Sequence, residues 1–240
     1  MDGVDIAARI RELAAERGAV ILAHNYQRAE VQDVADFVGD SLGLSRTAAA
    51  TDAEVIVFCG VHFMAETAKI LAPDRTVVLP RLDAGCPMAD MIGAGRLAAW
   101  KAEYPGVPVV TYVNSTAEVK ALTDICCTSA NAPQVVRSLG VDRVLFAPDR
   151  NLAHWVASQV AGVEVIAWNG SCPTHERIHA DDVIAVKELH PDAAVVAHPE
   201  CRPEVVDLAD AVLSTSGMLT YVAGTDASEI IVLTEEGLLH

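Results

Sequence analysis

Short apolar runs that end on polar side chains recur along the chain. The pattern is clearest in three segments: VILAHNYQ at 20–27, PVVTYVNST at 108–116 and AVVAHPEC at 194–201. Each apolar run has the length of a strand, so each segment predicts a buried β-strand. Because buried polar groups require hydrogen-bond partners, the polar residues at these ends need an explanation.

A constant spacing relates the three strand ends to a following Ser or Thr. Seventeen residues separate His24 from Ser41, Tyr112 from Ser129 and His198 from Thr215. Between the members of each pair, apolar residues three and four apart predict a short helix, over 30–37, 117–124 and 203–211. A second helix is predicted to begin at each Ser or Thr, and another helix is predicted over 4–17.

Further buried strands are predicted at 55–59, 144–147 and 230–233. In the first two copies a helix and a third strand follow, and the third strands lead to Cys86 and Cys172. Cys86 precedes Tyr112 by 26 residues, and Cys172 precedes His198 by 26. The chain is therefore a triplicated β-α unit with a period of 86–88 residues.

This alternation predicts an α/β fold of three three-layer units with parallel sheets, related by a pseudo-threefold axis. The expected domains are 1–85, 86–171 and 172–240. The period places a third Cys at about position 258, so the third unit is expected to be incomplete over 172–240, with an apolar sheet edge at 230–232. Since ligands bind beyond the carboxyl ends of parallel strands, we expect His24, Tyr112, Asn114 and His198 to face one shared cleft.

The Ser and Thr residues of the repeat have two interpretations. Ser41, Ser129 and Thr215 lie at predicted helix N-termini, where a hydroxyl, backbone N–H groups and the helix dipole attract anions. Three such helix starts would bind an anionic small molecule. Ordinary N-capping by each residue is the alternative.

Composition restricts the partners. A net charge of −16 argues against a nucleic acid or an anionic membrane as partner, because both require a cationic surface. The apolar runs are far shorter than the roughly 20 residues that span a bilayer, and charged residues interrupt the first segment where a signal peptide would lie. We expect a soluble cytoplasmic protein.

Six cysteines are present, and none forms a C-x-x-C pair. In a cytosolic chain they are expected to be buried thiols or metal ligands rather than disulfides. Cys86 and Cys172 occupy equivalent places and are each followed by Pro, and for them ligation and simple burial both stay open. For Cys59, Cys126, Cys127 and Cys201 the buried thiol is favoured. Three thiolates around an axis could hold a 4Fe-4S cluster with one open iron.

Several motifs together resemble the quinolinate synthase family, the A protein of NAD biosynthesis. They include LAHNYQ, DVADFVGDSLGLS, AGCPMADMI, TYVNSTAEVKALTDICCTSAN, PDRNLA, CPTHERI, HPEC and STSGML, and the resemblance runs from about residue 19 to 240. It implies three α/β domains around a 4Fe-4S cluster bound by one Cys per domain. It also implies condensation of iminosuccinate with dihydroxyacetone phosphate to quinolinate, with loss of phosphate and two waters, and a functional link to L-aspartate oxidase.

The resemblance also implies roles for individual residues. Cys86 and Cys172 would be cluster ligands, and Tyr26, Tyr112, Glu200 and His175 would be catalytic. The implied substrate-binding residues are His24, Ser41, Tyr112, Asn114, Ser129, His198, Glu200 and Thr215. As alternatives, the two tyrosines could hydrogen-bond between domains, and Glu200 could pair with Arg202.

One departure from the family pattern concerns the cluster. The family's third cluster Cys belongs to a C-terminal segment that residues 1–240 do not include. The alternative function is therefore a non-catalytic protein that binds a small dicarboxylate or phosphate without a cluster.

Overall fold

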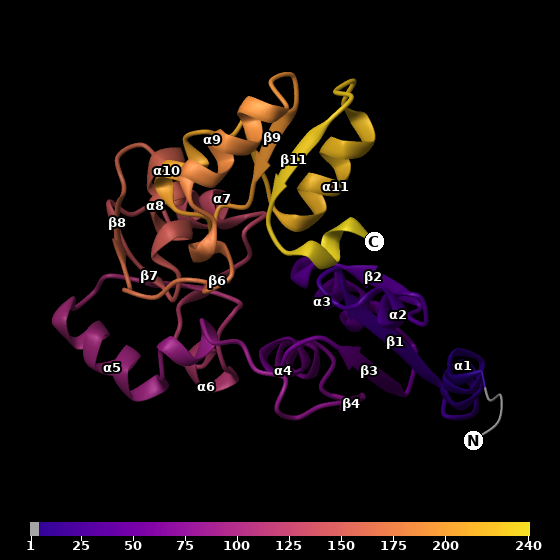
Figure 1. Ribbon diagram of the computed structural model, residues 1–240. Coiled ribbons are helices and arrows are strands. Elements are labelled where there is room, and N and C mark those ends of the chain that lie inside the picture. The colour runs from indigo at the N-terminus through magenta and orange to yellow at the C-terminus, as the bar shows by residue number, and fades with distance from the viewer. Residues whose placement is uncertain (1–4) are drawn as a thin grey trace. The chain divides into compact units, whose positions relative to one another are not determined.

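The computed structural model describes residues 5–240, which form two compact units (Figure 1). The first unit contains the chain up to Cys86 together with Glu236–His240, and the second contains Pro87–Glu235. Each unit is described by itself. The first helix, α1 (Ile6–Glu16), begins after Asp5, whose carboxylate accepts the N–H of Ala8; Val4, where the sequence predicts its start, lies outside the described residues.

The first unit is built on one parallel sheet of strand order β2-β1-β3-β4. Its elements after α1 are β1 (Ala19–His24), α2 (Ala29–Gln32), β2 (Phe37–Gly39), α3 (Ser41–Ala50), β3 (Val55–Cys59), α4 (His62–Leu71), β4 (Thr76–Val78) and the terminal 3-10 helix η3 (Glu236–Leu239).

The second unit contains two parallel sheets, of order β6-β5-β7-β8 and β10-β9-β11. The elements around the first of them are η1 (Ala89–Met91), α5 (Ala94–Glu103), β5 (Val109–Tyr112), α6 (Ala117–Lys120), β6 (Ile125–Cys127), α7 (Ala132–Ser138), β7 (Arg143–Ala147), α8 (Arg150–Gln159) and β8 (Glu164–Ala167). Those around the second are η2 (His175–Arg177), α9 (Ala180–Leu189), β9 (Ala194–Ala197), α10 (Pro203–Val206), β10 (Ala211–Val212), α11 (Thr215–Gly224) and β11 (Ile230–Leu233).

The predicted α/β class and the repeated parallel sheets are confirmed. Figure 1 shows α9 and α11 on opposite sides of the third sheet, as a three-layer unit requires. The third sheet has three described strands where the others have four, so β11 is an edge strand. Its first three residues are half-buried and only Leu233 is buried, which confirms the predicted apolar edge.

Three helix predictions are too long. The segments 30–37, 117–124 and 203–211 each contain one helical turn (α2, α6 and α10), and short strands β2, β6 and β10 lie at or just beyond the ends of these segments. The apolar runs in question are too short for periodicity to distinguish strand from helix.

An exposed carboxylate lies just before each of these short strands and fixes its entry. Asp36, Asp124 and Asp210 stand at the same place in the three repeats, and we call them the carboxylate pins. Each pin accepts the backbone N–H of a residue in the neighbouring central strand: Asp36 from Ile21 (2.7 Å), Asp124 from Val109 (2.8 Å) and Asp210 from Val195 (2.8 Å). Each pin also donates its own backbone N–H to the carbonyl of that same residue. The Asp side chain thus takes the place of a backbone acceptor in the hydrogen-bond ladder, just before the short strand begins.

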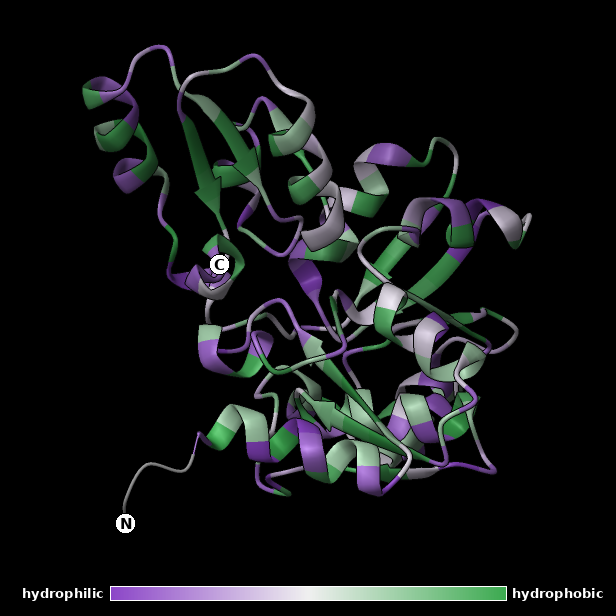
Figure 2. Cartoon of the chain, turned by 90° about the vertical axis from the view of Figure 1, so that its right-hand side faces the viewer, coloured by the Kyte–Doolittle hydropathy of each residue, from purple (hydrophilic) through white to green (hydrophobic). Residues whose placement is uncertain are grey.

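Figure 2 shows the strands as mainly apolar segments, whereas the helices alternate between polar and apolar residues. Parallel strands covered on both faces require this composition. In the second sheet Trp100 of α5 packs against Trp168, with ring centroids 5.3 Å apart. The equivalent of Trp100 one repeat later is Val186, which is 41% exposed.

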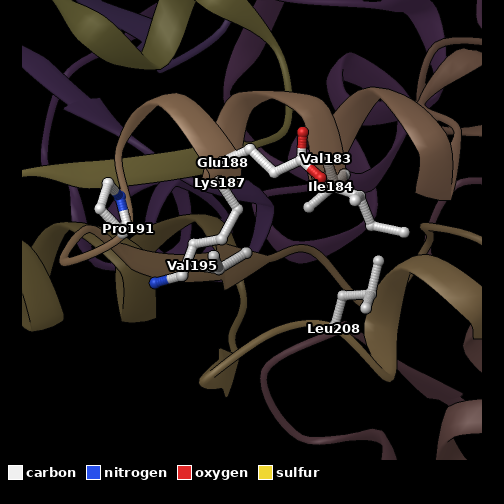
Figure 3. A pocket seen from close by; sticks show the side chains of 7 residues that line it. All are labelled: Val183, Ile184, Lys187, Glu188, Pro191, Val195 and Leu208. Atoms are coloured by element: carbon white, nitrogen blue, oxygen red, sulfur yellow. The ribbon is translucent and has the colours of Figure 1, made fainter.

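A shallow apolar pocket of about 260 Å³ lies beside α9 and is lined in part by Val195 of β9 (Figure 3). Val183, Ile184 and Leu208 line it, and Lys187 directs its ammonium to the carbonyl of Ala193. No cluster of nucleophiles or ligating groups is among the residues that line this pocket.

Candidate active site

A buried polar cluster occupies the carboxyl ends of β5 and β9 in the second unit. Tyr112 is the last residue of β5, and His198 and Glu200 follow β9. The Glu200 carboxylate is its centre. Its Oε2 atom lies 2.9 Å from His175 Nδ1 and 3.9 Å from His198 Nδ1, and Tyr112 hydrogen-bonds to the same carboxylate. All four side chains are buried, as expected for a polar network that satisfies itself.

His175 connects this cluster to a thiol and to a hydroxyl. Its Nδ1 atom is 3.1 Å from Cys172 Sγ, and its Nε2 atom is 2.9 Å from Thr234 Oγ1. Its ring stacks on that of His198, with centroids 4.7 Å apart. Sequence analysis missed Thr234, although it directly follows β11 and so obeys the same strand-end rule as the residues that were found.

Opposing effects set the protonation of Glu200. Burial acts to raise its pKa, but His198, His175 and the hydrogen bond from Tyr112 prevail and lower the pKa to about 2. Glu200 is therefore a carboxylate at neutral pH. It can only accept hydrogen bonds in that state, so Nδ1 of His175 carries a hydrogen that it donates to Oε2.

The pKa of the Cys172 thiol is raised, whereas that of Glu200 is lowered. Burial and the negative charge of Glu200 raise its pKa well above the usual range, while the backbone N–H groups of His175 and Thr174 act to lower it. The sulfur is therefore a thiol in the metal-free protein, and ligation of a metal would have to displace its proton.

Asp149 holds the loop that carries Cys172. It is fully buried; Oδ1 accepts the N–H of Leu152 at 2.7 Å and caps α8, and Oδ2 accepts the N–H of Cys172 at 3.0 Å. Burial and the charge of Glu200 raise its pKa, against the effect of these backbone N–H groups. Asp149 belongs to the PDRNLA motif, and no pattern along the chain predicted its role.

Charged residues next to the cluster join the second and third sheets. Glu176 receives hydrogen bonds from Arg150 at 2.7 Å and from Asn151 at 3.0 Å, and Arg202 lies 3.3 Å from the same carboxylate. Arg202 thus pairs with Glu176, whereas Glu200 pairs with histidines. The alternative in which Glu200 is the partner of Arg202 is wrong.

The hydroxyls of the repeat are not the helix caps. Ser41 and Thr215 are the first residues of α3 and α11, and the preceding residues Asp40 and Ser214 accept the capping N–H. Ser129 lies in a buried turn before α7, which begins only at Ala132, so the predicted helix start there is wrong. Ordinary N-capping therefore does not account for these side chains.

Asn114 and the candidate residues of the first unit complete the inventory. The Oδ1 atom of Asn114 is buried without a hydrogen-bond partner among the described residues. His24 ends β1, its Nδ1 accepts the backbone N–H of Tyr26 at 3.1 Å, and the two rings meet edge-on. Ser41 and Cys86 also belong to this unit. That all candidate residues share one cavity stays a prediction.

Gln32 and Gly237 of the same unit hold the loop that carries Tyr26 in place. Gln32 Nε2 donates to the carbonyls of Asn25, Gln27 and Gly237 at 2.8–3.0 Å. A Cβ at Gly237 would lie 2.8 Å from the backbone of Tyr26, so only glycine permits this approach.

Three ligating atoms of the site are close together. Those of Cys172, His175 and Glu200 all lie within 4.8 Å of one another, and the group could hold a metal ion. None of the six cysteines, all of which lie among the described residues, forms a disulfide. Cys201 is buried and donates its thiol hydrogen to the carbonyl of Leu233 at 3.4 Å, and burial raises its pKa to about 12. No described helix has the length and apolarity needed to cross a bilayer.

Repeated parallel α/β units whose strand ends gather a carboxylate, histidines, a tyrosine and a thiol are typical of the active sites of α/β enzymes, and three of these groups could hold a metal ion. The family model described as Quinolinate synthetase A protein matches residues 8–240. The chain belongs to the quinolinate synthase family.

Curated relatives agree. The chain is 59% identical to the quinolinate synthase of Thermodesulfovibrio yellowstonii over 231 residues, which cover 96% of this chain and 76% of the relative. It is 60% identical to that of Dehalococcoides mccartyi, with 98% and 78% covered. It is 56% identical to quinolinate synthase 1 of Methanosarcina acetivorans, with 100% and 79% covered.

Proposed function

We propose that the protein is a quinolinate synthase of NAD biosynthesis, which condenses iminosuccinate with dihydroxyacetone phosphate. Carbon, nitrogen and phosphorus balance when one phosphate and two waters leave, and no oxidant is required. The observation that carries the proposal is the buried contact of Glu200 with His175, His198 and Tyr112, because it assembles donors and an acceptor of protons at strand ends.

The family implies a 4Fe-4S cluster, and two thiols of this chain are suited to bind such a cluster. Cys86 and Cys172 are half-buried thiols outside any disulfide, at equivalent places of the repeat; Cys59 and Cys126 are half-buried as well but have no such equivalence, and Cys127 and Cys201 are buried in cores. Cys86 and Cys172 would hold the cluster. When bound, it would supply an iron without protein ligation that acts as a Lewis acid on substrate oxygen and nitrogen.

The protein side chains would handle protons. His175 Nδ1 and the Tyr112 hydroxyl both direct hydrogens at Glu200, and these donors are suited to protonate the hydroxyl groups that leave in the two dehydrations. Glu200, once a substrate displaces these donors, would accept a proton from substrate carbon. Tyr26 would serve as a further proton-transfer group.

Anion recognition would fall to the hydroxyls of the repeat. Ser41 and Thr215 begin helices that other residues cap, and Ser129 is buried in a turn, so each hydroxyl is suited to a carboxylate or phosphate. Asn114 offers a buried amide, and His24 and His198 would complete the set.

The cellular setting follows from the same proposal. Six cysteines outside any disulfide favour a reducing compartment, and we place the protein in the cytoplasm. Iminosuccinate is the oxidised form of aspartate, so L-aspartate oxidase is the proposed functional partner. We also propose the three-domain division at 85/86 and 171/172.

Anaerobic reconstitution with iron and sulfide, followed by iron analysis and a quinolinate assay, tests the function. Quinolinate formed from both substrates supports it. If malate or phosphate raises the melting temperature while no iron is retained and no quinolinate forms, the protein is instead a non-catalytic binder of small anions.

A further inference from the structure

We propose that Cys172, His175 and Glu200 also form a mononuclear site for one divalent metal ion of the Zn²⁺ or Co²⁺ class when no cluster is present. All three ligand atoms lie within 4.8 Å of one another. Two sides of this triangle are given by His175 Nδ1, which is 3.1 Å from Cys172 Sγ and 2.9 Å from Glu200 Oε2. The proposal does not rest on the quinolinate synthase reaction.

The spacing of these atoms suits a tetrahedral ion. Metal bonds of about 2.0–2.3 Å place the ligand atoms of a tetrahedron roughly 3.4 Å apart. The atoms around His175 Nδ1 therefore need to separate by only a few tenths of an ångström. One sulfur, one nitrogen and one carboxylate oxygen form a donor set that borderline ions prefer, and three protein ligands leave a fourth position open.

Thr234 supplies the outer contact that a ligating histidine needs. Metal binding requires the bare Nδ1 atom, so the ring hydrogen must reside on Nε2, where Thr234 Oγ1 at 2.9 Å can accept it. In the metal-free protein Nδ1 carries its hydrogen toward Glu200, and Thr234 Oγ1 either donates to Nε2 of the neutral ring or accepts from Nε2 of the imidazolium. A hydroxyl can take either role, so the same side chain supports both tautomers. The thiol hydrogen of Cys172 leaves to solvent.

The internal repeat provides a matched control. One period earlier, the residues equivalent to Cys172, His175 and Glu200 are Cys86, Ala89 and Asn114. Cys86 therefore has the same sequence context, followed by Pro, but its equivalents of His175 and Glu200 offer neither an imidazole nor a carboxylate. The proposed ion therefore binds at the site that contains Cys172 and not at the equivalent place around Cys86.

Cobalt is the probe because thiolate ligation gives a charge-transfer band in the near ultraviolet. The full chain is prepared free of iron, reduced and titrated anaerobically with Co²⁺. We expect one equivalent to bind with a thiolate-to-cobalt band and the intense visible bands of four-coordinate Co²⁺. Cys172→Ser should remove the near-ultraviolet band. Glu200→Gln and Thr234→Val should each weaken binding at least about tenfold. Cys86→Ser should leave the titration unchanged.

X-ray absorption of the cobalt complex keeps the test independent of any variant's folding. One sulfur per cobalt, with nitrogen and oxygen as the other ligands, supports the assignment. Two or more sulfurs per cobalt, loss of the band in Cys86→Ser, or absence of a thiolate band in the unmodified chain would each overturn it. Because no quinolinate is measured, failure of this site is distinguishable from failure of the proposed enzymatic function.

Discussion

His175 Nδ1 lies 2.9 Å from Glu200 Oε2, and this contact joins the loop after β8 to the loop after β9. It combines a ring that can donate a proton with a carboxylate that remains ionised at neutral pH. Both groups are 3% exposed or less, so bulk water does not compete for the hydrogen bond.

Replacing Glu200 by Gln keeps the shape of the side chain and removes its charge. We expect kcat for quinolinate formation to fall by about 10²–10⁴, the range of general acid–base effects. Glu204→Gln is the matched control, because Glu204 is an exposed residue of α10 whose nearest cation is 3.8 Å away. Equal kcat values for the two variants would remove Glu200 from the proposed chemistry.

Thr234 is expected to support, through its hydrogen bond with Nε2, the His175 tautomer that Glu200 favours. Thr234→Val has the same shape but no hydroxyl, so we expect kcat to fall about tenfold while KM changes little. Thr234→Ser should restore activity. The ¹⁵N spectrum of His175 should show hydrogen on Nδ1 in the metal-free wild type and in the Ser variant. An unchanged ¹⁵N pattern in Thr234→Val would mean that Glu200 alone fixes the ring.

The carboxylate pin at Asp124 should make stability pH-dependent. Burial acts to raise the pKa of Asp124, but the N–H of Val109 and Lys101 together lower it below its usual value. A carboxyl whose pKa falls on folding stabilises the protein above its unfolded pKa, about 3.9, and loses this effect as pH drops through the folded pKa.

Asp124→Asn is therefore expected to lower the free energy of unfolding by about 1 kcal/mol at pH 7, the usual size of one hydrogen bond's net contribution. The difference from wild type should shrink below about pH 4. Urea unfolding at pH 7 and pH 3 measures both values, with the exposed Asp142→Asn as control. A difference that is the same at both pH values would show that the charge of the pin is immaterial.

Gly237→Ala should disturb the loop that carries Tyr26. Its new Cβ would lie 2.8 Å from the Tyr26 carbonyl, a clash that backbone movement must relieve at a cost of about 1–3 kcal/mol. We expect a lower melting temperature and a lower kcat. Gly95→Ala, which meets open space on α5, should be neutral or stabilising. Full activity in Gly237→Ala would show that catalysis does not depend on the position in which Gly237 holds Tyr26.

Zinc should compete with cluster assembly, since Cys172 can serve only one of the two sites. One equivalent of Zn²⁺ added before anaerobic reconstitution is expected to reduce the iron incorporated. Glu200→Gln should raise the zinc concentration needed at least about tenfold. Iron uptake that is insensitive to zinc in the unmodified chain would contradict the shared ligand.

The main strands were predictable because their apolar runs recur at a constant period and end on polar groups. The strands β3 and β11 have the predicted bounds. The strands β2, β6 and β10 were not predictable, because two or three residues carry no periodicity and their pairing depends on the pins. The three pins themselves were visible as Asp residues at one offset, 12 residues after His24, Tyr112 and His198.

The candidate site was predictable only in its inner residues. Glu200 and His175 followed from motif resemblance, and Tyr112 and His198 from the repeat. Thr234 directly follows β11, so the strand-end rule could have identified it, and Asp149 belongs to the loop after β7. Their roles arise from three-dimensional contacts with His175 and Cys172, which no spacing rule along the chain contains.

The carboxylate pins have a consequence for how this architecture tolerates change. They keep the same residue type and the same backbone partner in all three repeats, while the residues equivalent to Tyr26 are Asn114 and Glu200. Register is thus secured by side chains at the opposite end of each strand from the candidate chemistry. The three repeats can therefore carry a phenol, an amide and a carboxylate at one equivalent position while the pairing of their strands stays the same.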